Sequence, residues 1–389
     1  MLGSMPSTSI SITSRLPQVG TTIFSVMSAL AQQHGAINLS QGFPDFDAPA
    51  ELLDLMTQAL RGGNNQYAPM TGLPVLREAI ADKVQALYGA RYDVADEITV
   101  TAGATQALFT AVAAFVHPGD EVIVFTPVYD SYAPAIELQG GTVVYADLAA
   151  PAYRPDWAAV RALVTPRTRM IIINSPHNPT GTVWTADDLA ELAAIVQGTD
   201  ILILSDEVYE HMVFDGQRHE SVMRHPALVE RSIVVSSFGK TYHITGWKVA
   251  YCLAPRELMA EFRKAHQFVV FTVHTPSQVA LAAFMRKPGS YDGLQALYQG
   301  KRDIFRQALA GSRFELLPCK GTYFQCVRYG AISDEGDRTF VERLTREHGV
   351  AAIPVSAFYP GGDDHGVIRF CFAKSAGTLE RALERLIRL

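Results

Sequence analysis

Two basic residues, Lys240 and Lys248, stand in a short loop between two apolar segments, 233–235 and 249–253. These segments are typical of buried strands, so Lys240 is held away from bulk water. A buried amine loses its charge readily, and an uncharged amine attacks carbonyl groups. Ser237 precedes Lys240 by three residues, and a hydroxyl beside the ammonium of Lys248 suits a phosphate. The loop therefore indicates a Schiff base between Lys240 and an aldehyde that also carries a phosphate.

Further polar and aromatic residues follow four other apolar segments, and each suits one part of such a molecule. The stretch 102–105, Ala-Gly-Ala-Thr, opens a helix, where backbone N–H groups bind phosphate. Asp206 ends the run 201–205, where a carboxylate is costly unless it meets a cation such as a pyridinium nitrogen. Tyr129 suits stacking on a flat ring, and Asn178 suits a hydrogen bond to a phenolate oxygen.

Taken singly, each of these residues has an ordinary structural interpretation, such as a strand–helix turn, a packed tyrosine or a helix-capping aspartate. Their joint occurrence, each after a different strand, favours one shared ligand. In open α/β sheets, ligands bind outside the carboxyl ends of the strands, so we expect these side chains to meet at one edge. The ligand that suits all of them is pyridoxal 5′-phosphate (PLP).

The rest of the chain predicts the sheet that would position these residues. Strands are predicted at 98–101, 121–125, 142–146, 170–174, 201–205, 232–236 and 249–253. Helices are predicted at 22–34, 51–61, 74–88, 105–116, 186–196 and 257–268. This alternation predicts an α/β fold with a mostly parallel seven-stranded sheet flanked by helices. Because the lysine loop is too short for a helical crossover, we expect the last strand to run antiparallel or to be reached by an unusual connection.

Beyond about residue 286 the pattern changes to a long polar helix at 291–310, several short strands and two more helices. This change predicts a smaller α+β domain at 286–389, after a large PLP-binding domain at 47–285. Residues 1–46 are expected to form an N-terminal arm and a helix that packs with the small domain. The arm itself, up to about Arg15, is rich in serine and threonine and is predicted to be flexible.

Composition and charge narrow the class of protein. The 389 residues are 48% hydrophobic and 19% charged, which is ordinary for a globular protein with a large core. A net charge of −6 gives no hint of a nucleic-acid surface, and the apolar runs are too short to span a membrane. Neither the four cysteines nor the histidines have metal-ligand spacing, so we expect no metal site. Without a recognisable signal peptide, we expect a cytoplasmic protein with reduced thiols.

Three motifs occur in an order that resembles the fold-type I, class I/II PLP-dependent aminotransferases. They are Asn-Pro-Thr-Gly at 178–181, Asp-Glu-Val-Tyr at 206–209 and Ser-Phe-Gly-Lys-Thr-Tyr at 237–242. The resemblance extends roughly from residue 16 to residue 389. Within that class, the stretches 38–46, 65–72 and 368–374 are most similar to the methionine aminotransferases, near the kynurenine/glutamine aminotransferase group.

The resemblance implies a role for each matching residue. Lys240 would form the Schiff base and then shuttle a proton, and Asp206 would pair with the pyridinium nitrogen. Asn178 and Tyr209 would bond the phenolate oxygen, and Tyr129 would stack on the ring. The residues implied to hold the phosphate are Gly103, Ala104, Thr105, Ser237, Lys248 and, from the neighbouring subunit, Tyr67. Many relatives have arginine at the position of Lys248. The lysine keeps the positive charge but lacks the bidentate fork of arginine.

The resemblance also implies a homodimer with active sites at its interface and a ping-pong transfer of an amino group from an amino acid to a 2-oxo acid. Arg369 would grip the substrate carboxylate, with Gly42 lending a backbone contact and Asn178 beside it. No second arginine in the motifs would meet an acidic side chain, and Phe24, Phe43 and Tyr323 are expected to form an apolar wall. Such a wall favours methionine as donor, with phenylalanine, tyrosine, tryptophan, histidine, glutamine or kynurenine as seconds.

Two other functions stay open. A lyase of the same fold, such as a cysteine-conjugate β-lyase, uses the same cofactor but expels a leaving group from Cβ, and fold does not fix the reaction. Some regulators carry an aminotransferase-like domain behind a DNA-binding one, but here only a short arm precedes the matched region. The residues do not identify the amino-group acceptor, the pathway or the full range of donors.

Overall fold

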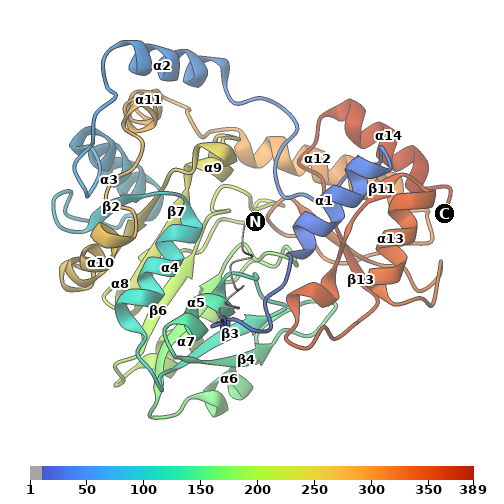
Figure 1. Cartoon of the computed structure of the whole chain (residues 1–389), viewed down its shortest axis with the longest axis horizontal. Helices are drawn as coiled ribbons and strands as arrows, with labels where there is room; N and C mark the ends of the chain where they lie inside the picture. Colours follow the sequence, from blue (N-terminus) through green and yellow to red (C-terminus); the bar gives the residue numbers. More distant parts are fainter. Residues whose placement is uncertain (1–10) are drawn as a thin grey trace, which may run out of the picture.

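The computed structural model describes residues 11–389 (Figure 1). The first part of the predicted flexible arm, residues 1–10, lies outside the described residues. The central element is a seven-stranded sheet with the strand order β2-β8-β7-β6-β5-β3-β4. Its strands are β2 (Ile98–Thr101), β3 (Glu121–Thr126), β4 (Thr142–Asp147), β5 (Thr168–Asn174), β6 (Leu202–Asp206), β7 (Ser232–Ser237) and β8 (Ala250–Leu253). All seven predicted strands are present, and the predicted fold class is confirmed.

The sheet is parallel except at β8, which runs antiparallel to both of its neighbours, β2 and β7. The chain between β7 and β8 holds only the four-residue helix α9 (Phe238–Thr241) and one 3₁₀ turn. Because a parallel connection needs a longer crossover, this short loop reverses the chain. The expected antiparallel strand is therefore confirmed, and the reversal leaves Lys240 at the carboxyl edge of the parallel strands.

Helices cover both faces of the sheet, and neighbouring residues of one strand face opposite layers. On β3, Val122 and Val124 pack on one side, while Ile123 and Phe125 pack on the other. The first side is covered by α4 (Ala104–Phe115), α5 (Tyr132–Leu138) and α10 (Arg256–Val269). The second side is covered by α3 (Pro74–Tyr88), α6 (Trp157–Leu163), α7 (Ala186–Val196) and α11 (Thr275–Met285). Because both faces of the sheet are covered, successive residues of a strand are apolar, and the strands appear in the sequence as continuous apolar runs.

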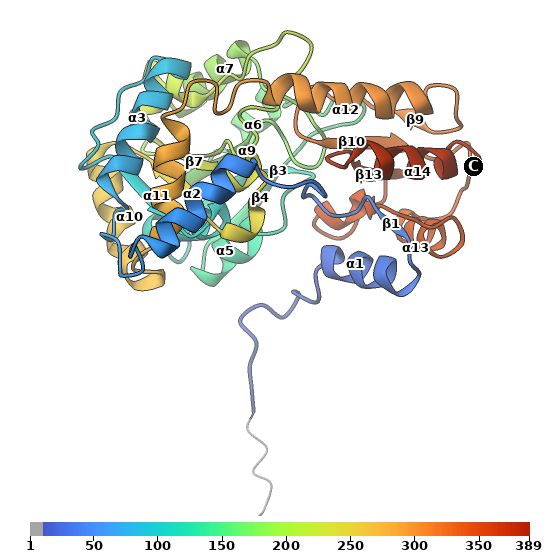
Figure 2. The ribbon, with the colours of Figure 1, turned by 90° about the horizontal axis from the view of Figure 1, so that it is seen from above.

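The C-terminal part forms a second, smaller sheet with the order β12-β13-β10-β9. Its strands are β9 (Glu315–Leu316), β10 (Phe324–Arg328), β12 (Ile353–Pro354) and β13 (Val367–Cys371), all paired antiparallel. Three helices accompany it: α12 (Leu294–Leu309), α13 (Asp337–Glu347) and α14 (Ala376–Leu386). Figure 2 shows this part beside the large sheet, as expected for a smaller α+β unit.

The N-terminal segment joins the C-terminal part rather than the large sheet. Helix α1 (Ile23–Gln33) packs on α13, and β1 (Ile37–Asn38) pairs in parallel with β11 (Val350–Ala351) (Figure 2). The following helix, α2 (Ala50–Arg61), packs on α11 in the other part of the molecule. The loop between β1 and α2 therefore crosses from the smaller part to the larger one.

The sequence analysis missed α5, α6, α11 and the four-residue helix α8 (Pro226–Val229). Helix α11 is buried on nearly all sides, so its sequence lacks the polar stripe by which a helix is recognised. Helix α5 is only seven residues long and has Pro134 in its first turn, where the missing N–H costs no helical hydrogen bond. The long helix predicted from residue 291 begins at Leu294, because Gly293 has a left-handed φ of 79° that ends the preceding turn.

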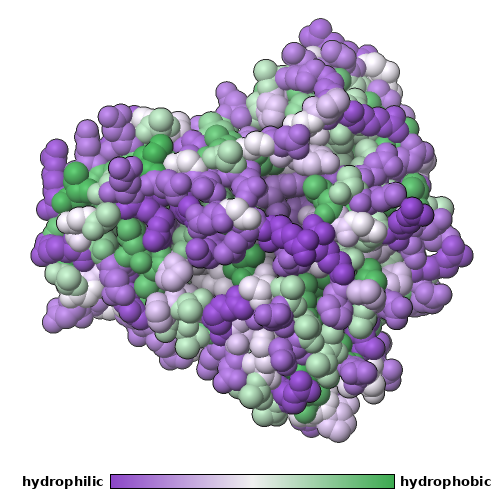
Figure 3. All heavy atoms as spheres, turned by 180° about the vertical axis from the view of Figure 1, so that it is seen from behind, coloured by the Kyte–Doolittle hydropathy of each residue, from purple (hydrophilic) through white to green (hydrophobic). Residues whose placement is uncertain are grey.

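Hydrophilic side chains dominate the face seen in Figure 3, with hydrophobic ones scattered among them. Within residues 11–389, no helix combines the length and the apolar character that crossing a membrane requires. The same residues contain no group of three or more histidine, cysteine, aspartate or glutamate side chains arranged to hold a metal ion.

Candidate active site

A cavity of about 320 Å³ opens at the carboxyl edge of the large sheet, between that sheet and the C-terminal part. It gathers nearly all the predicted site residues, which come from α1, from the loops after β2, β3, β5, β6 and β7, and from β13. Those that line it are Phe24, Gly42, Gly103, Ala104, Thr105, Tyr129, Asn178, Asp206, Tyr209, Ser237, Lys240, Lys248 and Arg369. Three predicted residues, Phe43, Tyr67 and Tyr323, do not line it.

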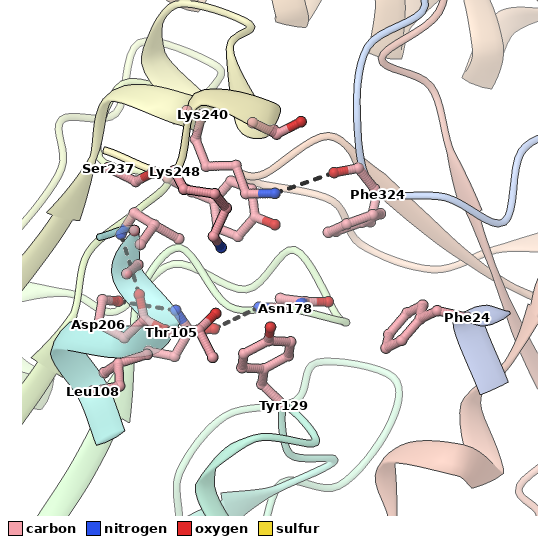
Figure 4. A pocket seen from close by; sticks show the side chains of 18 of the residues that line it. Phe24, Thr105, Leu108, Tyr129, Asn178, Asp206, Ser237, Lys240, Lys248 and Phe324 are labelled. Atoms are coloured by element: carbon pink, nitrogen blue, oxygen red, sulfur yellow. Dashed lines mark hydrogen bonds between the residues drawn. The ribbon is translucent and has the colours of Figure 1, made fainter. Parts of the chain in front are cut away.

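Lys240 lies in α9, directly after β7, and its amine points into the cavity (Figure 4). The Nζ atom donates hydrogen bonds to the hydroxyl of Tyr323 at 2.8 Å and to the carbonyl oxygen of Gly42 at 3.1 Å. Loss of hydration lowers the pKa of this amine to about 8. At this pKa roughly a tenth of the amine is neutral, and nucleophilic, at pH 7.

Tyr323 is fully buried and does not line the cavity. Its hydroxyl donates to the Gly42 carbonyl and accepts from Lys240, and its ring packs edge-on against Tyr209 at 5.2 Å. Phe43, the other residue expected in the substrate wall, is 45% exposed and lies beside Lys374. The expectation that these two side chains face the substrate is corrected: Tyr323 supports Lys240 from behind, and Phe43 faces solvent.

Asp206 ends β6 and is 4% exposed. One carboxylate oxygen accepts a hydrogen bond from the Tyr132 hydroxyl at 2.6 Å, and the other accepts from the Val208 N–H at 3.3 Å. Burial raises the pKa of this carboxyl to about 6, against the opposing effect of the Tyr132 hydrogen bond. Within residues 11–389 no ion pair compensates its charge. A cationic ring nitrogen would supply that missing partner.

Tyr132 is a functional residue that the sequence reasoning missed. It begins α5, three positions after Tyr129, and its N–H donates to the Tyr129 carbonyl at 3.3 Å, so a turn brings the two residues together. The two rings meet edge-on at 5.6 Å. A second aromatic residue at this spacing was the available signal, but only the structure brings its hydroxyl to Asp206.

The start of α4 forms an anion cradle together with two side chains. Gly103 has a left-handed φ of 82°, and a Cβ atom there would lie 2.9 Å from Cε and Nζ of Lys248. Glycine thus lets the lysine approach the first turn of α4, where the N–H groups of Ala104 and Thr105 have no partner within the helix. Ser237, at the end of β7, completes the group. Free N–H groups, an ammonium and a hydroxyl together suit a phosphate.

Arg369 lies on β13 and is 1% exposed. It donates to the Asn178 side-chain oxygen at 2.6 Å and to the Ser40 carbonyl at 3.4 Å, and its Nε finds no partner. Its guanidinium lies over the Phe324 ring at 3.8 Å. Burial lowers its pKa from the ordinary value, and among residues 11–389 no carboxylate pairs with it. A bound carboxylate would compensate this charge.

The remaining walls are aromatic or amide groups. Asn178 precedes Pro179 through a cis peptide bond and holds its side chain against Arg369. Tyr209 is buried, which raises the pKa of its hydroxyl and keeps it protonated as a hydrogen-bond donor. Tyr129 and Phe24 lie across the cavity from Lys240 (Figure 4). The cavity therefore offers an aromatic surface opposite the amine.

Tyr67 lies outside this cavity and is 82% exposed. Its ring packs edge-on against Phe271 at 5.5 Å, in a surface hollow formed by residues 65–67 and 272–276. Phe271 is itself 47% exposed. Tyr67 and its aromatic neighbour are therefore both uncovered in the single chain.

Comparison with known proteins identifies what the chain is similar to. The model of the family "Aminotransferase class I and II" matches residues 34–386. The methionine aminotransferase of Escherichia coli (strain K12) is 55% identical over 377 residues, which is 97% of this chain and 98% of that protein. A probable N-succinyldiaminopimelate aminotransferase of Mycobacterium tuberculosis is 39% identical over 96% of this chain and 97% of that one. Human kynurenine–oxoglutarate transaminase 1 is 34% identical, covering 92% and 93%.

Solved structures give the same result. A crystal structure of an Escherichia coli protein described as having a methionine aminotransferase function superposes with a TM-score of 0.96 at 55% identity, covering 98% of this chain and all of that one. The structure of N-succinyldiaminopimelate aminotransferase from Mycobacterium tuberculosis superposes with a TM-score of 0.93 at 39% identity, covering 97% and 100%.

Proposed function

The chain belongs to the class I and II aminotransferases, whose members use PLP, and we propose that it binds PLP in this cavity and transfers the amino group of methionine to a 2-oxo acid. The observation that carries the proposal is the set of uncompensated groups in one cavity. Lys240 offers an amine with a pKa of about 8, while Asp206 and Arg369 are buried charges that have no ionic partner among residues 11–389. Each would be satisfied by a different part of the cofactor or the substrate.

The cavity residues fit PLP group by group. The Ala104 and Thr105 N–H groups, the Ser237 hydroxyl and the Lys248 ammonium would hold its phosphate. Asp206, kept in place by Tyr132, would hold a proton on the ring nitrogen. Asn178 and Tyr209 would donate to the phenolate oxygen, and Tyr129 would cover one face of the ring.

When bound, PLP supplies an aldehyde for the amine and an electron-withdrawing ring that makes the Cα–H bond of the substrate acidic. The amine of Lys240 would anchor that aldehyde and, when free, would move the proton at the substrate Cα. Arg369 orients the substrate by its α-carboxylate through two parallel N–H bonds. The Gly42 carbonyl, which accepts from Lys240, holds the amine close to its place of action.

Methionine is the proposed donor because the cavity wall next to Arg369 is aromatic. Phe24 and Phe324 line it, and both rings lie within 5.5 Å of the Arg369 guanidinium. A thioether gains from area burial and from sulfur–aromatic contacts. The name of the 55% identical Escherichia coli relative supports the same substrate. Because one methylene changes the free energy by only about 1–3 kcal/mol in such a pocket, phenylalanine and other neutral amino acids should also react.

The proposal is tested by kcat/KM for methionine and for aspartate with one saturating 2-oxo acid. We expect methionine to exceed aspartate by roughly tenfold or more, since a carboxylate in an apolar wall lacks a partner. A higher value for aspartate would reject the substrate while leaving the family unchanged. Phe24→Ala should lower kcat/KM for methionine, and an unchanged value would remove Phe24 from the wall.

We also propose that the chain forms a homodimer with shared active sites, in which Tyr67 reaches the phosphate site of the partner subunit. The support is that Tyr67 is 82% exposed, lies outside its own cavity, and packs against Phe271, which is itself 47% exposed. Uncovered apolar surface of this kind indicates a protein–protein contact.

The proposed units remain an arm and helix at 1–46, a large domain at 47–285 and a small domain at 286–389. The buried free thiols support a cytoplasmic location.

The shared site predicts that two inactive variants complement each other. Tyr67→Phe should weaken PLP retention, because the partner phosphate loses a hydrogen-bond donor. When a Tyr67 variant with low activity is mixed with Lys240→Ala and subunits exchange, some heterodimers carry one intact site, so activity should reappear. Mass measurement of the mixed dimers verifies the exchange. No regained activity despite exchange, or an active monomer, would contradict the shared site.

The lowered pKa of Lys240 predicts the pH dependence of cofactor capture. Only the neutral amine attacks the aldehyde, so the rate of PLP uptake by the cofactor-free protein should rise about tenfold per pH unit and level off near pH 8. A solvated lysine would keep the rate rising to about pH 10.4. The rate is measured from the absorbance change on mixing, with Lys240→Ala as the baseline. A continued rise beyond pH 9 would show that Lys240 is hydrated.

A further inference from the structure

A second cavity of about 740 Å³ adjoins the first, and Phe24, Thr105 and Tyr129 line both. Its other walls are the segment before α1, the start of α5 and one side of α13. In Figure 4, Phe24 and Tyr129 lie next to each other at one end of the inner cavity. A substrate side chain that extends past these two rings would enter the outer cavity.

Three charged side chains line the outer cavity: Asp130, Arg338 and Glu342. Arg338 is exposed on α13, and Glu342 pairs with Arg346 at 3.2 Å. Asp130 is half-buried, and among residues 11–389 its carboxylate forms no ion pair and no hydrogen bond with another side chain. Water screens the two α13 side chains more strongly than it screens Asp130. Asp130 therefore dominates the charge that a substrate meets there.

Two anchors fix Asp130 in the loop after β3. On one side, the Val128 N–H donates to the Phe358 carbonyl at 2.7 Å, which ties the loop to the C-terminal part. On the other side, Tyr132 donates to Asp206. Burial raises the pKa of the Asp130 carboxyl, while the nearby charge of Arg369 favours its ionised form. The carboxylate thus lies within electrostatic reach of the proposed substrate site.

Resting on the proposed function, we propose that Asp130 is a specificity-determining residue that rejects substrates with an anionic side chain. A substrate whose α-carboxylate is bound by Arg369 and whose side chain passes Phe24 would bring a second carboxylate towards Asp130. Like charges at this depth repel, and such repulsion excludes a competitor that shape alone would admit. The 2-oxo acid uses the same site in the second half-reaction. The side chain of the preferred acceptor should therefore be uncharged as well.

Glutamine and glutamate test this proposal because they share a shape and differ in charge. In the wild-type enzyme, kcat/KM should be higher for glutamine than for glutamate. Asp130→Asn should lower the glutamine-to-glutamate ratio by roughly tenfold, while methionine changes little. In the same variant, 2-oxoglutarate should gain as an acceptor relative to 2-oxohexanoate, whose side chain is uncharged.

Two variants serve as controls. Asp130→Glu keeps the charge and should keep the wild-type ratio, which separates charge from folding. Asp187→Asn removes the same charge from an exposed position on α7, outside both cavities, and should leave the ratio unchanged. Thermal unfolding of each variant verifies that the chain is folded before the kinetics are compared.

Three results would overturn the inference. If the Asp130→Asn variant is folded and still transaminates methionine, but its glutamine-to-glutamate ratio of kcat/KM equals that of the wild type, the role of Asp130 is rejected and the proposed function is not. A uniform change for all three amino acids would show that Asp130 only stabilises the start of α5. A selective loss of glutamate turnover in Arg338→Gln would show that the outer cavity instead binds acidic side chains. Absence of wild-type transamination of all three amino acids would reject the proposed function, and this inference with it.

Discussion

Replacing Lys240 by alanine should reduce turnover of methionine by about 10⁴-fold or more, because the chain loses both its covalent anchor for the cofactor and its proton-transfer group. The fold should persist, since the side chain ends in a cavity and contributes only two hydrogen bonds, to Gly42 and Tyr323. Steady-state kinetics and a thermal unfolding curve measure the two effects separately.

Lys264→Ala provides the matched control, because Lys264 is a solvent-exposed lysine on α10. Its kcat and KM should equal those of the wild type. Borohydride reduction of the PLP-loaded wild type, followed by peptide mapping, should place the pyridoxyl adduct on Lys240. An adduct on another lysine would reject Lys240 as the anchor, as would substantial turnover in Lys240→Ala.

Arg369→Lys should lower kcat/KM by roughly tenfold or more for methionine and phenylalanine alike, a loss of at least about 1.4 kcal/mol in transition-state stabilisation. Lysine keeps the positive charge but lacks the planar fork that binds a carboxylate through two N–H groups. It also cannot reproduce the bond to Asn178 while reaching the substrate. Because every substrate carries the α-carboxylate, the loss should not depend on the side chain.

Arg343→Lys is the control for this substitution, since Arg343 pairs with Glu335 at the surface of α13. It should leave kcat/KM unchanged for both amino acids. If Arg369→Lys also kept the wild-type value, the α-carboxylate would be held elsewhere. A loss confined to one of the two amino acids would show that Arg369 contacts the substrate side chain rather than the α-carboxylate that both substrates share.

The positions of the strands could be predicted from the sequence because each is a short, mostly apolar run, and all of them except the edge strand β4 are buried on both faces. The short loop around Lys240 left two outcomes open for β8, an antiparallel strand or an unusual connection, and the structure shows the antiparallel strand. Helix α11 could not be predicted in the same way. Its helical character depends on burial between α2 and α3, which leaves no amphipathic pattern in the sequence.

The cavity could be predicted in outline because ligands bind at the carboxyl ends of parallel strands. The residues that follow each predicted strand can be found in the sequence without knowing how the strands are arranged. Contacts between distant segments could not be predicted in this way. Tyr132 bonds Asp206 across 74 positions, and Arg369 bonds Asn178 across 191. Tyr323 was expected in the substrate wall, yet it lies behind Lys240, because its position depends on how the C-terminal sheet packs against the Gly42 loop.

The most direct test of the central claim is a single turnover of the PLP-loaded enzyme with excess methionine and no 2-oxo acid. The account predicts that the cofactor ends as pyridoxamine phosphate, with one equivalent of 4-methylthio-2-oxobutyrate formed per site and no ammonia released. Subsequent addition of a neutral 2-oxo acid should restore PLP. Release of ammonia with the cofactor remaining as PLP would instead indicate elimination, and a cofactor unchanged by methionine would contradict the proposed transfer.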